Sequence, residues 1–221
     1  MKYGVPMRRQ QQAEASRAAL VAAARECFAG KGYDDTTVAE VLRRAGMARG
    51  ALYHYFPDGK DELFAAVYRE VDDELHRRID ALDPDMPPLD AVRESAAIFL
   101  QLCTRQDFAR ITVLEGPRVM ASQSIHGSVL GRSVTRMRAG IAAAAEAGEL
   151  DDLDVDLVTT ALYGALRDLG ARVATTPRGR RRAADGALST FSRLLDGVAV
   201  PTTARVTTSA RRTSAAHRES A

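Results

Sequence analysis

Two short helical segments joined by a glycine-containing turn limit most strongly what this chain can fold into. In the capping pattern of Thr37–Glu40, the threonine hydroxyl and the glutamate carboxylate can each bond a free backbone N–H, which predicts a short helix from about Val38 to Arg44. The turn Ala45–Met47 follows, and a second short helix is predicted from about Ala48 to Phe56. Two short helices joined in this way are typical of a helix-turn-helix.

The remainder of the chain is also predicted to be helical. Before the helix-turn-helix, Leu20, Ala23, Ala24, Cys27 and Phe28 recur at the spacing of one buried helix face. Aromatic residues make up only 5% of the sequence and alanine is frequent, which favours packed helices over a sandwich of sheets. No segment shows a convincing strand pattern, so the predicted fold class is all-α.

Composition and hydrophobic periodicity divide the chain into four parts. Residues 1–15 are expected to form a flexible, mildly basic arm, and residues 16–60 a helix-turn-helix domain. A long helix over residues 60–82 connects this domain to a helical domain over residues 61–198. Residues 199–221 contain almost nothing apolar, which predicts a disordered tail. After a candidate hinge at 83–88, helices are predicted at about 89–104, 107–114, 117–122, 126–147, 154–175 and 180–197.

Few residues suggest chemistry other than binding. Cys27 and Cys103 each lie in an apolar helical run, so two buried thiols are expected, with redox sensing as the alternative. The four histidines lack metal-ligand spacing, and no catalytic motif is recognisable, so no enzyme activity, cofactor or metal is expected. No charged and apolar leader opens the chain. No apolar run approaches the roughly 20 residues of a membrane span, so we expect a cytoplasmic protein without a membrane partner.

The net charge of +2 conceals an uneven distribution along the chain. Residues 1–60 carry 10 basic and 6 acidic side chains (+4), residues 61–160 carry 10 and 19 (−9), and residues 161–221 carry 11 and 4 (+7). A basic N-terminal part beside an acidic middle indicates that only part of the chain meets a polyanion. Ordinary variation of surface charge is the alternative.

The second short helix carries residue types suited to the major groove of DNA. Arg49 can donate two hydrogen bonds to guanine O6 and N7. Gly50 and Ala51 allow the helix backbone to approach closely, and the methyl group of Ala51 can meet the methyl group of thymine. A recognition helix needs small or polar residues of this kind near its N-terminus.

The aromatic residues that follow divide between core and surface. Leu52 and Phe56 are four residues apart and are expected to face the core, whereas Tyr53 and Tyr55 lie on other faces. A tyrosine hydroxyl can bond a phosphate oxygen and fix the register on DNA, and Lys60 could bond another phosphate. The alternative is that both tyrosines pack against the arm or the long helix.

Residues 16 to about 68, roughly a quarter of the chain, resemble the DNA-binding domain of the TetR (tetracycline repressor-like) family of transcriptional regulators. Two positions depart from the family pattern. Ala48 replaces the usual Ser or Thr cap, and the segment Pro57–Lys60 is one residue longer than the commonest spacing. The resemblance rests on the stretches FAGKGY (28–33), TTVAEV (36–41), AGMARGALYHYFP (45–57) and KDELF (60–64). It implies DNA contacts at Thr37, Arg49, Gly50, Ala51, Tyr53, Tyr55 and Lys60.

The resemblance also implies the rest of the architecture. It implies a helical C-terminal domain for ligand binding and dimerisation, and a homodimer on near-palindromic double-stranded DNA that is released by a small-molecule effector. The family pairs its last two helices across the two-fold axis, although these faces could instead be buried within one subunit. The candidate interface residues are Leu162, Ala165, Leu166, Leu169, Ala187, Leu188, Phe191 and Leu195.

A ligand pocket is expected among the helices of the middle region, although an apolar stripe at helical spacing is more often plain core. Glu115 could meet a cationic or hydrogen-bonding ligand or could be a solvated carboxylate, and Arg118 and His126 are further polar candidates. The candidate lining residues are Ile98, Leu102, Phe108, Ile111, Leu114, Glu115, Met120, Met137 and Tyr163.

The sequence therefore predicts a ligand-responsive, sequence-specific DNA-binding regulator. A repressor is favoured over an activator, because a bound dimer can block polymerase without any added contact surface. One alternative is a sequence-nonspecific architectural DNA-binding protein, which the arginine-rich run at 177–182 would serve. Another is a helical interaction protein without a role on DNA. The effector, the operator and the regulated genes cannot be read from the sequence.

Overall fold

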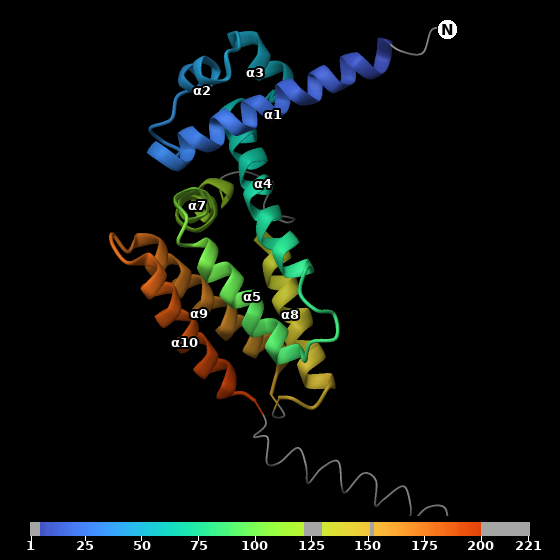
Figure 1. Ribbon diagram of the computed structural model, residues 1–221, viewed down its shortest axis with the longest axis vertical. Helices are drawn as coiled ribbons and strands as arrows, with labels where there is room; N and C mark the ends of the chain where they lie inside the picture. Colours follow the sequence, from blue (N-terminus) through green and yellow to red (C-terminus); the bar gives the residue numbers. More distant parts are fainter. Residues whose placement is uncertain (1–4, 122–129, 151–152, 200–221) are drawn as a thin grey trace, which may run out of the picture.

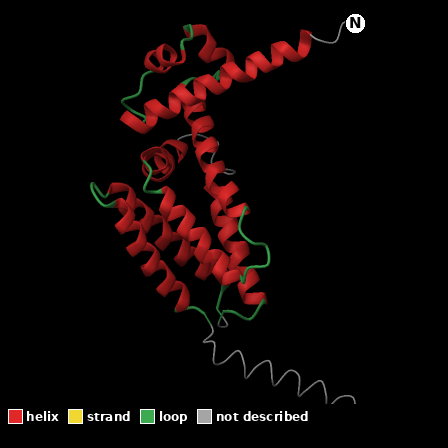
Figure 2. Ribbon diagram, in the orientation of Figure 1, coloured by secondary structure: helices red, strands yellow, loops and turns green. Residues whose placement is uncertain are grey.

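The computed structural model describes residues 5–121, 130–150 and 153–199, which form a small helical domain above a larger one (Figure 1). Helices account for most of these residues (Figure 2). Within the described segments the only extended pairing is an isolated antiparallel bridge between Leu150 and Ala199. The predicted all-α fold class is therefore confirmed. Residues 200–221 of the expected tail lie outside the described residues.

The small domain consists of α1 (Val5–Lys31), α2 (Val38–Ala45) and α3 (Arg49–Tyr55). A tight turn joins α2 to α3, and Gly46 adopts a left-handed conformation there (φ 67°) that residues with side chains rarely adopt. The N–H of Gly46 donates to the carbonyl of Arg43, and the N–H of Met47 donates to the carbonyl of Leu42. These bonds satisfy the last carbonyls of α2 and turn the chain sharply into α3.

Helix α1 begins at Val5 rather than at Ser16, so most of the segment expected to be a flexible arm continues the helix. Residues 10–15 read QQQAEA, and glutamine, alanine and glutamate are all good helix formers. Gln10 also donates a side-chain hydrogen bond to Glu14, one turn further along (3.4 Å). The prediction followed the apolar stripe, which starts only at Leu20 and therefore could not locate this exposed extension.

The long helix α4 (Lys60–Asp80) runs from the small domain into the large one, as predicted (Figure 1). Its first half is fixed in the small domain by Phe64, whose ring packs edge-on against Phe28 and Tyr33 at centroid distances of 5.2 Å. Val67 and Val71 are completely buried further along. Because α4 belongs to both cores, a displacement of its second half is transmitted to its first.

The large domain packs α5 (Pro88–Leu102), α8 (Leu130–Glu146), α9 (Val155–Thr175) and α10 (Arg180–Asp196) side by side (Figure 1). The short segments α6 (Gln106–Phe108), η1 (Ala109–Glu115, π-helical) and α7 (Gly116–Ala121) lie between this bundle and α1. The predicted bounds agree with the observed ones within a few residues. The π-helical geometry of η1 was not predicted, because periodicity indicated an ordinary helix over 107–114.

Two glycines bring α5 into direct contact with neighbouring helix backbones. A Cβ atom on Gly140 of α8 would lie 2.8 Å from Val92 Cγ2, and one on Gly170 of α9 would lie 2.5 Å from Phe99 Cε1. No side chain fits at either distance. These close approaches fix the positions of the helices that enclose the cavity described below.

Candidate functional site

The exposed side of α3 presents three of the residues expected at DNA. Arg49 and Gly50 are exposed, and Tyr53 is 48% exposed. On the opposite side, Leu52 and Phe56 are 0% and 1% exposed. The predicted division of this segment into a core face and a surface face is confirmed.

The two remaining candidates on α3 are partly covered. Ala51 and Tyr55 are half-buried, and the ring of Tyr55 meets the ring of His54 edge-on at 4.7 Å. Tyr55 also packs against the hydrophobic core. The expected alternative, in which the tyrosines serve packing, therefore describes Tyr55 better than Tyr53.

The caps of the two short helices differ. Thr37 is exposed, and its Oγ1 accepts a hydrogen bond from the N–H of Glu40 (3.3 Å), as the sequence predicts. The carboxylate of Glu40 instead lies 2.7 Å from Lys31 Nζ, and this hydrogen bond lowers the pKa of Glu40. Ala48 has the extended backbone of an N-cap (φ −76°, ψ 157°) but no side chain that can cap α3.

Lys60 is turned toward the end of α1. Its Nζ lies 4.2 Å from the ring centroid of Tyr33 and donates a hydrogen bond to the carbonyl of Asp34 (3.4 Å). The preceding residue, Gly59, has φ 70° and lies against Tyr53. The longer segment before α4 thus gives Lys60 two partners that it would have to leave in order to reach a phosphate.

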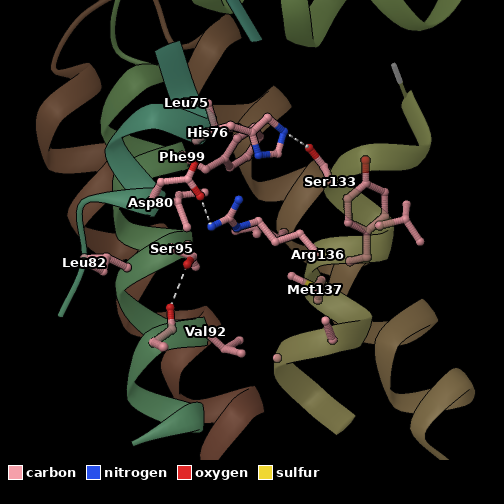
Figure 3. A pocket seen from close by; sticks show the side chains of 18 of the residues that line it. Leu75, His76, Asp80, Leu82, Val92, Ser95, Phe99, Ser133, Arg136 and Met137 are labelled. Atoms are coloured by element: carbon pink, nitrogen blue, oxygen red, sulfur yellow. Dashed lines mark hydrogen bonds and ion pairs between the residues drawn. The ribbon is translucent and has the colours of Figure 1, made fainter. Parts of the chain in front are cut away.

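The large domain contains a cavity of about 780 Å³ enclosed chiefly by α4, α5, α8 and α9 (Figure 3). Leu75, Ile79, Val92 and Phe99 supply much of its apolar wall. This volume lies within the range of small-molecule sites. Of the residues predicted to line a pocket, Met137 and Tyr163 do so.

The other predicted pocket residues lie elsewhere, and His126 is outside the described segments. Their apolar stripe belongs to plain core, because hydrophobic periodicity cannot distinguish a wall from a filled interior. Leu102, Phe108, Ile111 and Met120 are at most 1% exposed core residues, Ile98 packs partly buried against the core, and Leu114 is 41% exposed.

Three polar residues of the cavity wall are buried and were missed from the sequence. Asp72, His76 and Thr112 are 3%, 1% and 9% exposed. His76 Nε2 lies 3.4 Å from Asp72 Oδ2 and 3.4 Å from Ser133 Oγ. The available signal was the acid and the histidine four residues apart beside Val71 and Leu75, on the apolar face of the long helix.

Glu115 and Arg118 do not line the cavity. They instead connect the large domain to the small one. The carboxylate of Glu115 accepts a hydrogen bond from the N–H of Tyr33 (2.5 Å), and Arg118 donates to Asp34 (2.8 Å). Burial raises the pKa of Glu115. From the same segment, Gln106 and Arg110 each donate to a carbonyl of the last turns of α1, at Ala29 and Gly30 respectively (both 3.0 Å).

A cluster of charges ties α1 to α4 and α6. Arg25 bonds Glu70 (3.0 Å) and Asp107 (2.5 Å), and Arg105 bonds Asp107 (2.8 Å) and Glu74. Burial of Asp107 opposes its ionisation, but the hydrogen bonds from Arg105 and Arg25 outweigh burial and lower its pKa to about 2. The cluster therefore remains ionised at neutral pH and clamps the domains together.

The predicted interface residues on α9 and α10 mostly face the interior of the subunit. Five of them pack on the core because α9 and α10 both lie against α5. The outer face of α9 and α10 instead exposes Leu157 (70%) and Leu194 (47%), and Leu153, just before α9, is 45% exposed. Leu162, Leu166, Ala187, Phe191 and Leu195 are at most 8% exposed, and Ala165, Leu169 and Leu188 are half-buried.

The described part of the chain has neither a helix suited to cross a membrane nor a group of side chains suited to bind a metal ion. None of its helices combines the length and the apolar character needed to cross a bilayer. Within residues 5–121, 130–150 and 153–199, no three His, Cys, Asp or Glu side chains are grouped so that they could hold a metal ion. The two cysteines are free and buried, as expected.

Comparison with known sequences matches both domains to one family. Residues 20–67 match the model for bacterial regulatory proteins of the tetR family, and residues 89–198 match the model for the tetracyclin repressor-like C-terminal domain. The HTH-type transcriptional repressor Rv1474c of Mycobacterium tuberculosis is 48% identical over 56 residues, which cover 25% of this chain and 29% of that protein. The repressor AcnR of Corynebacterium glutamicum is 44% identical over 55 residues, with the same coverage.

Solved structures match over most of the chain. A TetR-family transcriptional regulator from Pectobacterium atrosepticum superposes with a TM-score of 0.70 at 25% identity and covers 86% of this chain and 97% of its own. TylP, a TetR regulator from Streptomyces fradiae, superposes with a TM-score of 0.66 at 25% identity, over 86% of this chain and 90% of its own. With both domains matched in order and the fold shared, this chain belongs to the TetR family of transcriptional regulators.

Proposed function

We propose that this chain is a homodimeric, sequence-specific transcriptional repressor that leaves its operator when a small molecule occupies the cavity of the large domain. The observation that carries the proposal is α3, a short helix that buries Leu52 and Phe56 while exposing Arg49, Gly50 and Tyr53. A helix anchored in this way can enter the major groove with its N-terminal residues against the base edges.

On DNA, each residue of the surface has a proposed role. Arg49 reads guanine, and Gly50 and Ala51 admit the helix close to the bases. The hydroxyl groups of Thr37 and Tyr53 bond phosphates and fix the register, and the half-buried Tyr55 reaches a phosphate only at the edge of the surface. Lys60 reaches a phosphate only if it leaves Tyr33 and Asp34.

A homodimer on a near-palindromic operator follows from the proposal. Two copies of α3 about 34–36 Å apart would enter successive major grooves. The outer face of α9 and α10 supports this pairing, because Leu157 and Leu194 are exposed at the end where α9 begins and α10 finishes. Ala161 and Gly164 continue the face of α9 with small residues that allow close approach of a partner helix.

Release by an effector is supported by the position of the cavity wall. Thr112 and Val113 of η1 line the cavity, while Arg110 and Glu115 of the same segment bond the end of α1 and the turn after it. A ligand that displaces η1 or α4 therefore acts on the helix-turn-helix as well. Coupling of about 1–3 kcal/mol, or about 5–150-fold in DNA affinity, is typical of such switches.

The relatives support repression, although this chain spans only about 29% of the length of the curated relatives it matches. Those relatives, Rv1474c and AcnR, are named HTH-type transcriptional repressors, and their similarity is confined to a stretch of about 56 residues. Repression by this chain is accordingly part of the proposal.

Selection from a pool of random duplexes tests the proposed function and identifies the operator in the same experiment. The proposal expects enrichment of a near-palindrome whose half-sites are about 10–10.5 base pairs apart or a multiple of that spacing. The same selection with Arg49→Ala should lose the guanine preference, whereas Arg77→Ala, at an exposed position near the far end of α4, should retain it. Binding without any enriched sequence would contradict the proposal and favour a sequence-nonspecific role.

A further inference from the structure

One end of the cavity holds a buried carboxylate whose hydrogen bonding is incomplete. Asp72 is 3% exposed and lines the cavity from α4. Within the described residues, its Oδ2 atom accepts no hydrogen bond, and His76 Nε2 lies 3.4 Å from it. An ionised group that leaves water without such bonds is costly to bury.

Two further polar atoms of the cavity-lining residues are buried without a hydrogen bond. His76 Nδ1 and Thr112 Oγ1 lack hydrogen-bond partners in the described part of the chain. Tyr68 and Tyr163 line the cavity, and burial raises the pKa of each, with a smaller contribution from the charge of Asp72. Both phenols are therefore neutral at physiological pH and present hydroxyl groups and aromatic faces rather than a countercharge.

The remaining charged groups of the cavity wall are already matched or lie outward. Asp80 is paired with Arg136 across the cavity, between α4 and α8 (Figure 3). Arg167 lies 3.7 Å from Asp168 and is 60% exposed. Asp83 is exposed in the loop that follows α4. Among the described residues, the acid of the cavity wall that still lacks a hydrogen bond is Asp72, whose Oδ2 has the ring of His76 3.4 Å away.

The rest of the wall fits an apolar body. Leu75, Ile79, Val92, Phe99 and Met137 contribute apolar side chains to the wall, so a ligand that fills the cavity must bury hydrocarbon or aromatic surface. A hydroxyl head group would supply the hydrogen bond that Asp72 lacks. A protonated amine would supply the same bond together with a full countercharge, and the neighbouring aromatic faces also favour a cation.

We propose that the cavity binds an organic amine with a large apolar body, whose ammonium group bonds Asp72. The proposal rests on the proposed function insofar as the cavity is taken to be the effector site. It commits to a positively charged head group and rejects acids, since a carboxylate would meet the charge of Asp72 at close range.

Three probes with the same chain and different head groups test the proposal by isothermal titration calorimetry. They are octylamine, 1-octanol and octanoic acid, which at neutral pH are positive, neutral and negative. Because the apolar body is constant, differences in Kd report the head group. We expect octylamine to bind about tenfold more tightly than octanol, and octanoate to bind more weakly than either. Octanol or octanoate binding as tightly as octylamine would overturn the proposal.

A matched pair of variants assigns the effect to one carboxylate. Asp72→Asn keeps the shape but removes the charge, and it should weaken octylamine about tenfold or more while changing octanol little. Asp73→Asn, at the next residue of α4 but outside the cavity wall, should change neither affinity. Unchanged octylamine affinity in Asp72→Asn would overturn the assignment. If that variant fails to fold, the head-group order in the unaltered protein still decides the proposal.

The failure of this proposal can be told from the failure of the proposed function. Calorimetry measures occupation of the cavity, whereas operator affinity in the presence of octylamine measures release. Tight octylamine binding that depends on Asp72 but leaves operator affinity unchanged would support the amine site and contradict the role of the cavity in release.

Discussion

At the scale of single residues, the start of α3 lacks a capping group. Ala48 holds the backbone conformation of an N-cap, and no side chain there accepts from the first N–H groups of α3. By contrast, Thr37 caps α2 through its hydroxyl. The recognition helix is therefore the less well-capped of the pair, although its exposed face has to hold its geometry on DNA.

Replacing Ala48 by serine should stabilise the protein. The hydroxyl can accept from a free N–H in the first turn of α3, so Ala48→Ser should raise the free energy of unfolding by about 1 kcal/mol. Urea unfolding followed by circular dichroism measures the change. Thr37→Ala is the matched reverse change and should lower the free energy of unfolding by a similar amount. A loss of stability in Ala48→Ser would show that the backbone at Ala48 does not act as a cap.

The two thiols should be unreactive in the folded protein. Burial raises the pKa of Cys103 to about 12 and raises that of Cys27 as well, so the thiolate is scarce at pH 8. Mass spectrometry after brief iodoacetamide treatment should find neither cysteine alkylated in buffer and both alkylated in denaturant. Rapid modification in buffer would support the redox-sensing alternative.

The surface positions of two residues suited to bind DNA were predicted correctly from the sequence. Arg49 and Tyr53 were assigned to a surface, and they are exposed. The polar groups of the cavity were missed, because a buried acid and a solvated acid look alike in sequence unless the apolar residues on the same helix face are considered. Asp72 and His76 are removed from water only in the fold, where α5 and η1 pack against α4.

At the scale of elements, the order of the helices and most of their ends were predictable, whereas local irregularities were not. Gly46, Pro87–Pro88 and Gly179 mark helix ends through their own backbone preferences. The π-helical segment η1 depends on contacts made from both sides. A Cβ atom on Gly116, at its end, would lie 2.4 Å from Tyr68 Cε2, so the path of this segment is set by α4.

The charge cluster between α1, α4 and α6 should contribute to stability only above acidic pH. The pKa of Asp107 is lowered to about 2 in the folded protein, against about 3.9 for an unfolded chain. Its contribution is therefore complete above about pH 4 and is lost as pH falls through about 2. At pH 7, Asp107→Asn should lower the free energy of unfolding by about 2 kcal/mol.

Urea unfolding of Asp107→Asn and the unaltered protein across this pH range measures the effect. The difference between the two should shrink as pH falls from 4 toward 2. Asp168→Asn serves as the control. Asp168 is 79% exposed, and its ion pair with Arg167 is long at 3.7 Å, so this pair should contribute little to stability. A difference that stays constant over the acid range would show that Asp107 acts through packing rather than charge.

At the scale of the whole molecule, the arrangement of faces was the least predictable feature. The apolar stripes of α9 and α10 were recognised, but whether a stripe meets α5 or a second subunit depends on the long-range fold. Phe191 and Leu195 turned out to be completely buried inside the subunit. The exposed Leu157 and Leu194 then remain as the apolar residues for the proposed dimer.

Introducing a charge on this outer face should break the dimer. In a dimer with two-fold symmetry, each substitution occurs once in each subunit. Leu157→Asp therefore places two carboxylates against apolar surface and should weaken dimerisation at least about 100-fold. Sedimentation velocity over a range of concentrations measures the dissociation constant. Leu114→Asp, at a leucine exposed elsewhere, should leave it unchanged. If Leu157→Asp remains as dimeric as the unaltered protein, the subunits do not pair through this face.

The central claim is sequence-specific DNA binding through α3, and fluorescence anisotropy on labelled DNA from upstream of the protein's own gene tests it most directly. A scrambled duplex at two salt concentrations separates specific from phosphate-driven binding. We expect tight binding to the upstream DNA alone, a loss of about ten- to a hundredfold in Arg49→Ala, and no loss in Arg77→Ala. Equal binding to both duplexes that disappears with salt and ignores Arg49→Ala would contradict the account.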